Sequence, residues 1–228
     1  MRWPTLVRRR EAWVLTPWGW IAVLIVIAGA IVFAARHLHS FLAQNEPLGA
    51  RILVVEGWLD PEELDQAIAT IRSQGYAHII TTGGPIESWP ELRGFPTYAQ
   101  RAAHYLTQRG IDRTRVTVVP APASAQDRTF LSAVMVRDWA SHSGIRLTSL
   151  DVFSAGTHAR RSRLLYQLAF GPRVAIGIYA ARDSGYDGTE WWRTAWGTRD
   201  VLEQAVGLLW VKLFFRPPVE GSRRELWG

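Results

Sequence analysis

The sequence predicts an α/β fold, a three-layer Rossmann-like arrangement with a mostly parallel sheet, preceded by one N-terminal transmembrane helix. Three observations predict this class. After residue 50, short apolar runs alternate with stretches of helical length, a pattern typical of right-handed βαβ crossovers. Hydrophobic residues make up 48% of the 228 residues and charged residues 20%, as in folded domains. The third observation is an uncharged apolar run near the N-terminus.

The apolar run covers residues 18–35 and contains no charged residue, so it is long enough to cross a bilayer as a helix. We expect a membrane anchor over residues 14–36, with tryptophans at its front edge, where aromatic side chains meet the membrane surface. A cleaved signal peptide is the alternative, although its apolar region is usually shorter.

The charges around the anchor predict its orientation. Four arginines precede the run, whereas only Arg36 follows it closely. The positive-inside rule therefore predicts a cytoplasmic N-terminus over residues 1–13 and an extracytoplasmic main domain. We expect a single-pass protein of the inner (cytoplasmic) membrane.

The main domain is expected at residues 51–215, after a linker at 37–50 and before a C-terminal tail at 216–228. Apolar runs bounded by glycine or polar residues predict strands at 51–58, 77–84, 115–122, 147–156 and 173–181. Stretches of helical length predict helices at 60–75, at 97–110, within 125–144, directly after the fourth strand, and at 198–215. The first helix shows the usual signals, because Asp60 is a plausible N-cap, Pro61 takes the first position and Gly75 ends it.

Polar residues and glycines gather where the predicted strands end. Ligands of an open parallel sheet bind beyond these carboxyl ends, and glycine lets backbone N–H groups approach a ligand closely. Each glycine alone is also compatible with an ordinary turn. The candidate ligand-binding and catalytic residues at these ends are Glu56, Gly57, Gly83, Gly84, Asp127, Arg128, Thr129, Thr157, His158 and Arg161.

The stretch FSAGTHARRSRLL, residues 153–165, places a histidine and three arginines at the start of a predicted helix. The positive end of the helix dipole disfavours cations there. Thr157 is the expected N-cap. At helical spacing, His158 and Arg161 lie toward the leucine face that packs on the sheet, above the strand ends.

Arg160 and Arg163 point away from that face, so we expect them in solvent. A bound anion would balance His158 and Arg161, since N–H groups, helix dipole and guanidinium all attract it. The alternative is a structural salt bridge of Arg161 with Asp127 or Glu56.

Several classes of protein are excluded or unsupported. The chain has no cysteine, which excludes disulfides, thiol catalysis and Cys-zinc sites. The motifs GxGxxG, GxxxxGK[ST], GxSxG and HExxH are absent, so the sequence assigns neither a cofactor nor a metal site. The net charge of +6 is spread along the chain, and we expect no nucleic-acid partner.

The segments LVVEGW, ITTGG, DRT and SAGTHARRS, which follow one another at successive strand ends, resemble the YdcF/SanA/ElyC-like family of bacterial proteins. The C-terminal WWRTAWGTRDVLEQAVGLLW resembles the tail of one branch. The resemblance covers residues 50–215 and implies a Rossmann-like fold. It further implies a role in envelope integrity, peptidoglycan assembly or lipid-carrier metabolism, or the binding of S-adenosylmethionine.

The family pattern H-x-x-R matches His158 and Arg161, and its glycine pair matches Gly83 and Gly84. In the polar loop after the third strand, only Thr129 matches cleanly. The family's glutamate is missing from APASAQDRT, so Asp127 and Arg128 would stand in its place.

Three hypotheses follow. The first is an envelope enzyme acting on a phosphate or pyrophosphate linkage of a cell-wall or polyprenyl intermediate. In it Arg128 and Arg161 hold the anion, His158 is a general acid or base with a pKa near neutrality, and Asp127 or Glu56 orients His158 or a water molecule. The second is a non-catalytic ligand-binding or scaffolding protein of the envelope, and the third is an S-adenosylmethionine-binding protein. The tryptophans near residues 191–210 either fill the core or lie at a lipid surface.

Overall fold

The computed structural model describes residues 13–86, 94–124, 127–222 and 224–225. It consists of two units, Met1–His37 and Leu38–Gly228. Helix α1 (Pro17–Leu42) begins in the first unit and ends in the second, and it is long and apolar enough to cross a membrane. At 1.5 Å per residue, its 26 residues exceed the hydrocarbon thickness of about 30 Å. The arginines on which the predicted orientation rests lie among residues 1–10, outside the described residues.

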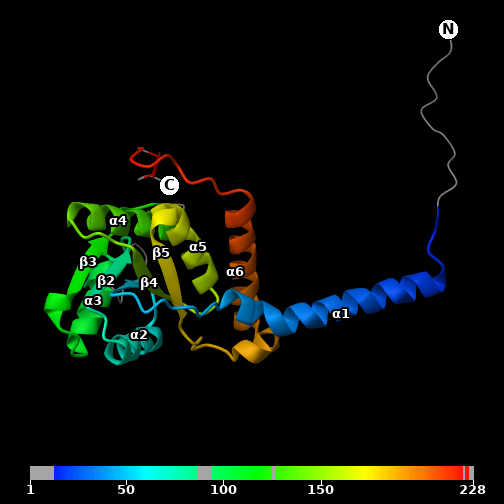
Figure 1. Cartoon of the computed structure of the whole chain (residues 1–228). Coiled ribbons are helices and arrows are strands. Elements are labelled where there is room, and N and C mark those ends of the chain that lie inside the picture. The colour runs from blue at the N-terminus through cyan, green and yellow to red at the C-terminus, as the bar shows by residue number, and fades with distance from the viewer. Residues whose placement is uncertain (1–12, 87–93, 125–126, 223, 226–228) are drawn as a thin grey trace, which may run out of the picture. The chain divides into compact units, whose positions relative to one another are not determined.

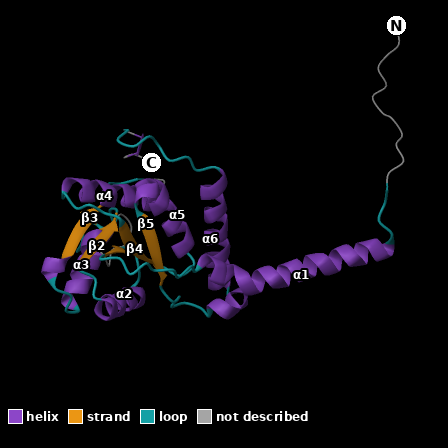
Figure 2. Cartoon of the chain, viewed as in Figure 1, coloured by secondary structure: helices purple, strands orange, loops and turns teal. Residues whose placement is uncertain are grey.

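The second unit contains a five-stranded parallel sheet in the order β3-β2-β1-β4-β5 (Figure 2). The prediction of an α/β domain with a mostly parallel sheet is confirmed. The chain builds outward from β1 in one direction and then returns to add β4 on its other side, so the direction of winding reverses between β1 and β4. Ligands of such sheets bind at this reversal. The strands are β1 (Ile52–Glu56), β2 (His78–Gly83), β3 (Val116–Pro120), β4 (Ser149–Ser154) and β5 (Ala175–Ala180).

Helices cover both faces of the sheet (Figure 1). Alternate residues of β1 enter two separate cores: Ile52 and Val54 pack with α4 and α5, whereas Leu53 and Val55 pack with α2 and α3. The main helices are α2 (Pro61–Gln74), α3 (Tyr98–Gln108), α4 (Arg128–His142), α5 (Ala159–Phe170) and α6 (Ala195–Leu213). Short 3-10 turns are η2 (Arg113–Arg115), η3 (Gly171–Arg173) and η4 (Gly188–Arg193).

The predicted end signals are confirmed for α2 and are wrong for the start of α5. At α2, Asp60 and Glu63 form a reciprocal capping box, and Gly75 ends the helix in the left-handed conformation with φ of 66°. The prediction of Thr157 as N-cap of α5 is wrong, because α5 begins one residue later, with His158 at the cap position. Thr157 instead donates a hydrogen bond of 2.6 Å to Asp200 on α6.

The stretch expected to be a linker, residues 37–50, is packed into the domain. Leu42 is fully buried, and Glu46 pairs with Ile178 as an antiparallel bridge on β5. Asp151 accepts hydrogen bonds from the N–H groups of Leu48 at 2.8 Å and Ala50 at 2.9 Å. The physical reason is that β5 is an edge strand, whose free backbone groups take up an extended neighbour. Residues 38–50 therefore belong to the domain and do not form a free linker.

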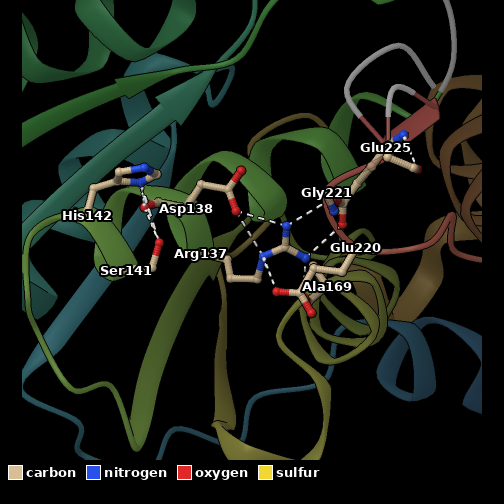
Figure 3. A network of polar contacts seen from close by, with 9 residues as sticks. Arg137, Asp138, Ser141, His142, Ala169, Glu220, Gly221 and Glu225 are labelled. Carbon is tan, nitrogen blue, oxygen red and sulfur yellow. Dashed lines mark hydrogen bonds and ion pairs between the residues drawn. The ribbon is translucent and has the colours of Figure 1, made fainter.

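The described part of the C-terminal tail is docked on α4 (Figure 3). Arg137 donates two hydrogen bonds to the buried carboxylate of Glu225, at 2.7 and 3.0 Å. It also bonds Asp138 and the carbonyl oxygen of Ala169 on α5. This network holds the chain end against the face formed by α4 and α5.

Candidate functional site

A pocket of about 940 Å³ opens at the carboxyl ends of the central strands. The N-termini of α4 and α5 and one side of α6 complete its wall. The predicted site residues that line it are Glu56, Gly83, Gly84, Asp127, Arg128, Thr129, His158 and Arg161. The structure thus brings together residues from four separate segments of the sequence.

Gly57 and Thr157 are not among the lining residues. At Gly57, a Cβ would lie 2.4 Å from the carbonyl oxygen of Tyr98 and 2.8 Å from that of Thr82, so glycine is needed for the close approach of β1 to α3. Gly83 has φ of +148° and would meet the Cβ of Tyr98 at 2.8 Å. The nearest neighbour of a Cβ at Gly84 is 3.5 Å away, so packing alone does not require glycine at this position of the pocket wall.

Glu56 lies at the floor of the pocket, at the end of β1, and is only 2% exposed. Its carboxylate accepts hydrogen bonds from Ser154 at 2.6 Å and Ser162 at 2.8 Å. Burial raises the pKa of Glu56 to about 7, although both hydroxyls and the charge of Arg161 oppose the rise. A carboxyl group that titrates near neutrality is suited to proton transfer.

His158 is also buried, at 6% exposure. Its Nδ1 lies 2.9 Å from Oε1 of Gln204 and 2.9 Å from Nη2 of Arg161, and its Nε2 lies 3.3 Å from the hydroxyl of Thr129. Burial, followed by the charge of Arg161, lowers the pKa of His158 to about 3, against the opposing Gln204 bond. The expectation that His158 titrates near neutrality is therefore wrong, because the ring is buried beside a guanidinium.

The partner that orients the histidine also differs from the sequence prediction. Gln204 on α6 contacts Nδ1, whereas Glu56 is held by Ser154 and Ser162. A neutral imidazole has one donor and one acceptor, so Nδ1 cannot donate to Gln204 and accept from Arg161 in the same tautomer. The ring is thus poised between two alternative hydrogen-bond arrangements.

Arg161 extends from the first turn of α5 into the pocket and is half-buried. Its guanidinium occupies the space left by the missing side chain of Gly207, where a Cβ would lie 2.0 Å from Nη1. Within the described residues, no carboxylate lies within 4.0 Å of this guanidinium. The predicted alternative, a salt bridge with Asp127 or Glu56, is absent from this part of the chain. Burial lowers the pKa of Arg161.

The other two arginines of α5 are engaged rather than free in solvent, which corrects the sequence prediction. The guanidinium of Arg160 lies 4.0 Å from the ring centre of Phe41 and its Nε donates to the Phe41 carbonyl. Arg163 forms a 2.6 Å ion pair with Glu46 and donates to the carbonyl of Ile176. Both side chains fasten the segment that follows α1, because that segment lies beside α5 and β5.

The start of α4 forms the opposite side of the pocket. Asp127 takes the left-handed conformation with φ of 49°, which is unusual for a residue other than glycine, and its side chain does not cap the helix. Burial raises the pKa of Asp127. Arg128 is exposed and Thr129 is partly buried. No contact of Asp127 or Arg128 with His158 is present among the described residues.

Part of the pocket wall, supplied by α6 and by aromatic residues, was not predicted from the sequence. Gln204, Gly207 and Trp210 come from α6, and Trp58 meets the ring of His158 edge-on with centroids 5.0 Å apart. Thr82 also lines the pocket, and its buried hydroxyl has no hydrogen-bond partner within the described part of the chain. The sequence offered one signal for this wall, namely Gln204, a polar residue within a mostly apolar helix.

No group of three or more histidine, aspartate or glutamate side chains within the described residues could hold a metal ion. No family model matches the chain, and no curated protein matches it. The fold and the pocket define an α/β protein with a candidate site at the strand ends.

Proposed function

We propose that this chain is a membrane-anchored envelope biogenesis factor of the YdcF/SanA/ElyC type, whose pocket binds a phosphorylated cell-wall or lipid-carrier intermediate. The observation that carries the proposal is Arg161, a half-buried guanidinium in the pocket with no carboxylate within 4.0 Å among the described residues. A buried charge is stable only when it is paired. A phosphate or pyrophosphate group supplies the missing partner through charge-assisted hydrogen bonds.

The groups around Arg161 suit an anion. The hydroxyl of Thr82 is a free donor within the described residues, and Gly84 lines the pocket without a side chain. The starts of α4 and α5 both reach the pocket, and helix N-termini attract anions. Carboxylates near the pocket oppose this attraction: Asp127, and also Glu56, Glu203 and Asp200, whose charges act on Arg161. The pKa of Asp127 is raised, Glu56 is mostly neutral below its pKa of about 7, and the side chain of Glu203 is 62% exposed.

The rest of the wall suits the apolar chain of a polyprenyl carrier. Trp58, Tyr98, Leu165, Val206 and Trp210 all line the pocket. An amphiphile with a phosphate head would place its charge at the polar floor and its first isoprene units against this wall. Such carriers are present at the membrane to which α1 would anchor the domain. In this proposal the chain crosses the inner (cytoplasmic) membrane once, with its N-terminus in the cytoplasm.

Hydrolase or transferase activity is a second candidate, favoured by the carboxyl group of Glu56. With a pKa of about 7, Glu56 can give or take a proton at the reacting oxygen. Arg161 and Arg128 would stabilise the charge that develops on the phosphoryl group. A non-catalytic factor would bind the same ligand without turnover. An S-adenosylmethionine-binding protein would need the domain in the cytoplasm.

A thermal-shift experiment on the full chain in detergent tests the binding proposal. The ligands are inorganic phosphate, pyrophosphate, a soluble polyprenyl-phosphate analogue and S-adenosylmethionine. The variants are Arg161→Ala and, as matched control, Arg163→Ala, which removes an arginine of the same helix that does not line the pocket. We expect the phosphate ligands to raise the Tm of the wild type and of Arg163→Ala, and to leave the Tm of Arg161→Ala unchanged. An equal rise in all three proteins, or none, would contradict the proposal, and product analysis by mass spectrometry separates binding from turnover.

A further inference from the structure

Helix α6 carries apolar side chains on two opposite sides. One side is buried against the domain and contains Val201, Leu208 and Val211. The other side, here called the outer stripe, consists of Leu202, Val206, Leu209 and Leu213, each about half exposed or more, at 48%, 66%, 56% and 58%. At 3.6 residues per turn the two sets lie on opposite faces. Such a continuous exposed apolar face marks an interaction surface.

Aromatic residues extend this surface at both ends of the helix. Trp196 is 61% exposed, Trp210 44% and Phe214 69%. Of the two alternatives for the tryptophans of this region, packing in the core holds for Trp191, which is buried, and not for Trp192, Trp196 and Trp210, which are exposed. Tryptophan favours the water–lipid boundary, where its ring is partly desolvated and its N–H stays hydrated.

The chain enters the domain close to α6. His39, in the last turn of α1, bonds Asp183 at 2.7 Å and packs on Gly188, where a Cβ would lie 2.2 Å from the ring. Gly188 begins η4, which packs on the start of α6. Residues 38–50 are bound to the domain, and the chain joins them directly to the apolar part of α1. A short tether gives a high effective lipid concentration, so even a modest apolar surface binds.

We propose that the outer stripe of α6 inserts into the headgroup region of the membrane that anchors the chain. This inference rests on the membrane anchor of the proposed function. Val206 and Trp210 belong both to this surface and to the pocket wall. The pocket therefore opens at the lipid surface, where a lipid-linked phosphate can enter from the bilayer without crossing water.

The test uses the full chain reconstituted in vesicles of phosphatidylethanolamine and phosphatidylglycerol. Because the chain has no cysteine, single substitutions can carry an environment-sensitive fluorophore. Leu209→Cys and Leu213→Cys place it on the outer stripe, and Gln108→Cys places it on an exposed site of α3 as control. We expect quenching by spin-labelled lipid, together with a blue shift, at the two α6 positions and neither at the control.

Equal quenching at all three positions, or none at the α6 positions, would overturn the proposal. A blue shift without lipid quenching, accompanied by Leu209→Cys cross-linking between copies, would assign the surface to a second copy of the chain instead. Carbonate extraction of the same vesicles tests the anchor separately. Extraction of the chain refutes both anchor and docking, whereas a retained chain with unquenched probes refutes the docking alone. The double variant Leu209→Gln/Leu213→Gln should weaken lipid quenching of a probe at Val206→Cys while the chain stays in the vesicles.

Discussion

The substitution Gly207→Ala displaces the guanidinium of Arg161 without removing it. Its Cβ would lie 2.0 Å from Nη1 and 3.0 Å from Cζ of Arg161. Both distances are shorter than an ordinary carbon contact of about 3.5 Å, so the guanidinium has to move by more than an ångström. The arginine side chain is flexible and half-buried, so it can move while the backbone of α6 stays in place.

The expected effects on binding and on stability have opposite signs. A hydrogen bond to a charged group contributes about 1.5–3 kcal/mol. Loss of one such bond would weaken pyrophosphate binding by about 10- to 100-fold, at 1.4 kcal/mol per factor of ten. Alanine is favoured over glycine inside a helix by about 1 kcal/mol. The Tm of the unliganded protein should therefore stay the same or rise.

Isothermal titration calorimetry with pyrophosphate gives the Kd, and a melting curve of the same sample gives the stability. Arg163→Ala is again the matched control and should keep the wild-type Kd. An unchanged Kd in Gly207→Ala would refute the role of Arg161 as the anion ligand. Weaker binding together with a lower Tm would also refute the reasoning, since it would indicate that α6 has repacked.

The remaining predictions concern stability. The pKa of Glu56 is raised from 4.5 to about 7 in the folded state. The protonated carboxyl group therefore contributes to the free energy of unfolding at low pH, and this contribution is lost as the pH rises through 7. The free energy of unfolding of Glu56→Gln, relative to that of the wild type, should therefore rise by about 3 kcal/mol between pH 4.5 and 8.5. A difference between the two proteins that does not change with pH in urea unfolding would contradict this. Glu225→Ala should lose about 1–3 kcal/mol in urea unfolding, because it removes two charge-assisted hydrogen bonds of Arg137 while the ion pair with Asp138 remains. Glu220→Ala is the control, because the side chain of Glu220 is 79% exposed and lies 3.8 Å from the same arginine. This variant should lose less than about 0.5 kcal/mol, and equal losses in the two variants would refute the greater importance of Glu225. Asp151→Asn weakens the acceptor of two backbone N–H groups and should lower the free energy of unfolding by about 1–3 kcal/mol. It should also speed proteolysis at residues 43–50, which Asp151 holds to the domain. An unchanged cleavage rate would count against this role of Asp151.

Local signals were sufficient to predict the sheet and the polar side of the site. Each strand was marked by an apolar run, and α2 by the capping residues around Asp60. Since all five strands run parallel, residues that follow their carboxyl ends must gather at one edge. This geometric rule is why Glu56, Gly84, Thr129 and Arg161 were expected together and line one pocket.

The missing part of the site depends on tertiary packing. Helix α6 is apolar on both sides, so hydrophobic periodicity could not show which side faces the domain. Gln204 and Gly207 therefore remained undetected, although one contacts His158 and the other makes room for Arg161. The docking of residues 38–50 was missed for a related reason. Nothing in that stretch resembles a strand, and its partner is the free edge of β5.

Burial changes the chemistry that the residue types alone suggest. A histidine and a glutamate in a cleft would ordinarily be assigned as a partly protonated base and a fixed negative charge. Here desolvation moves each toward its neutral form, with the pKa of His158 near 3 and that of Glu56 near 7. Below neutrality the floor of the pocket therefore carries the charge of Arg161 with little compensation from its two closest titratable neighbours. The same burial that makes His158 a poor base would strengthen the attraction of Arg161 for an anion in the proposed site, because both effects come from the exclusion of water.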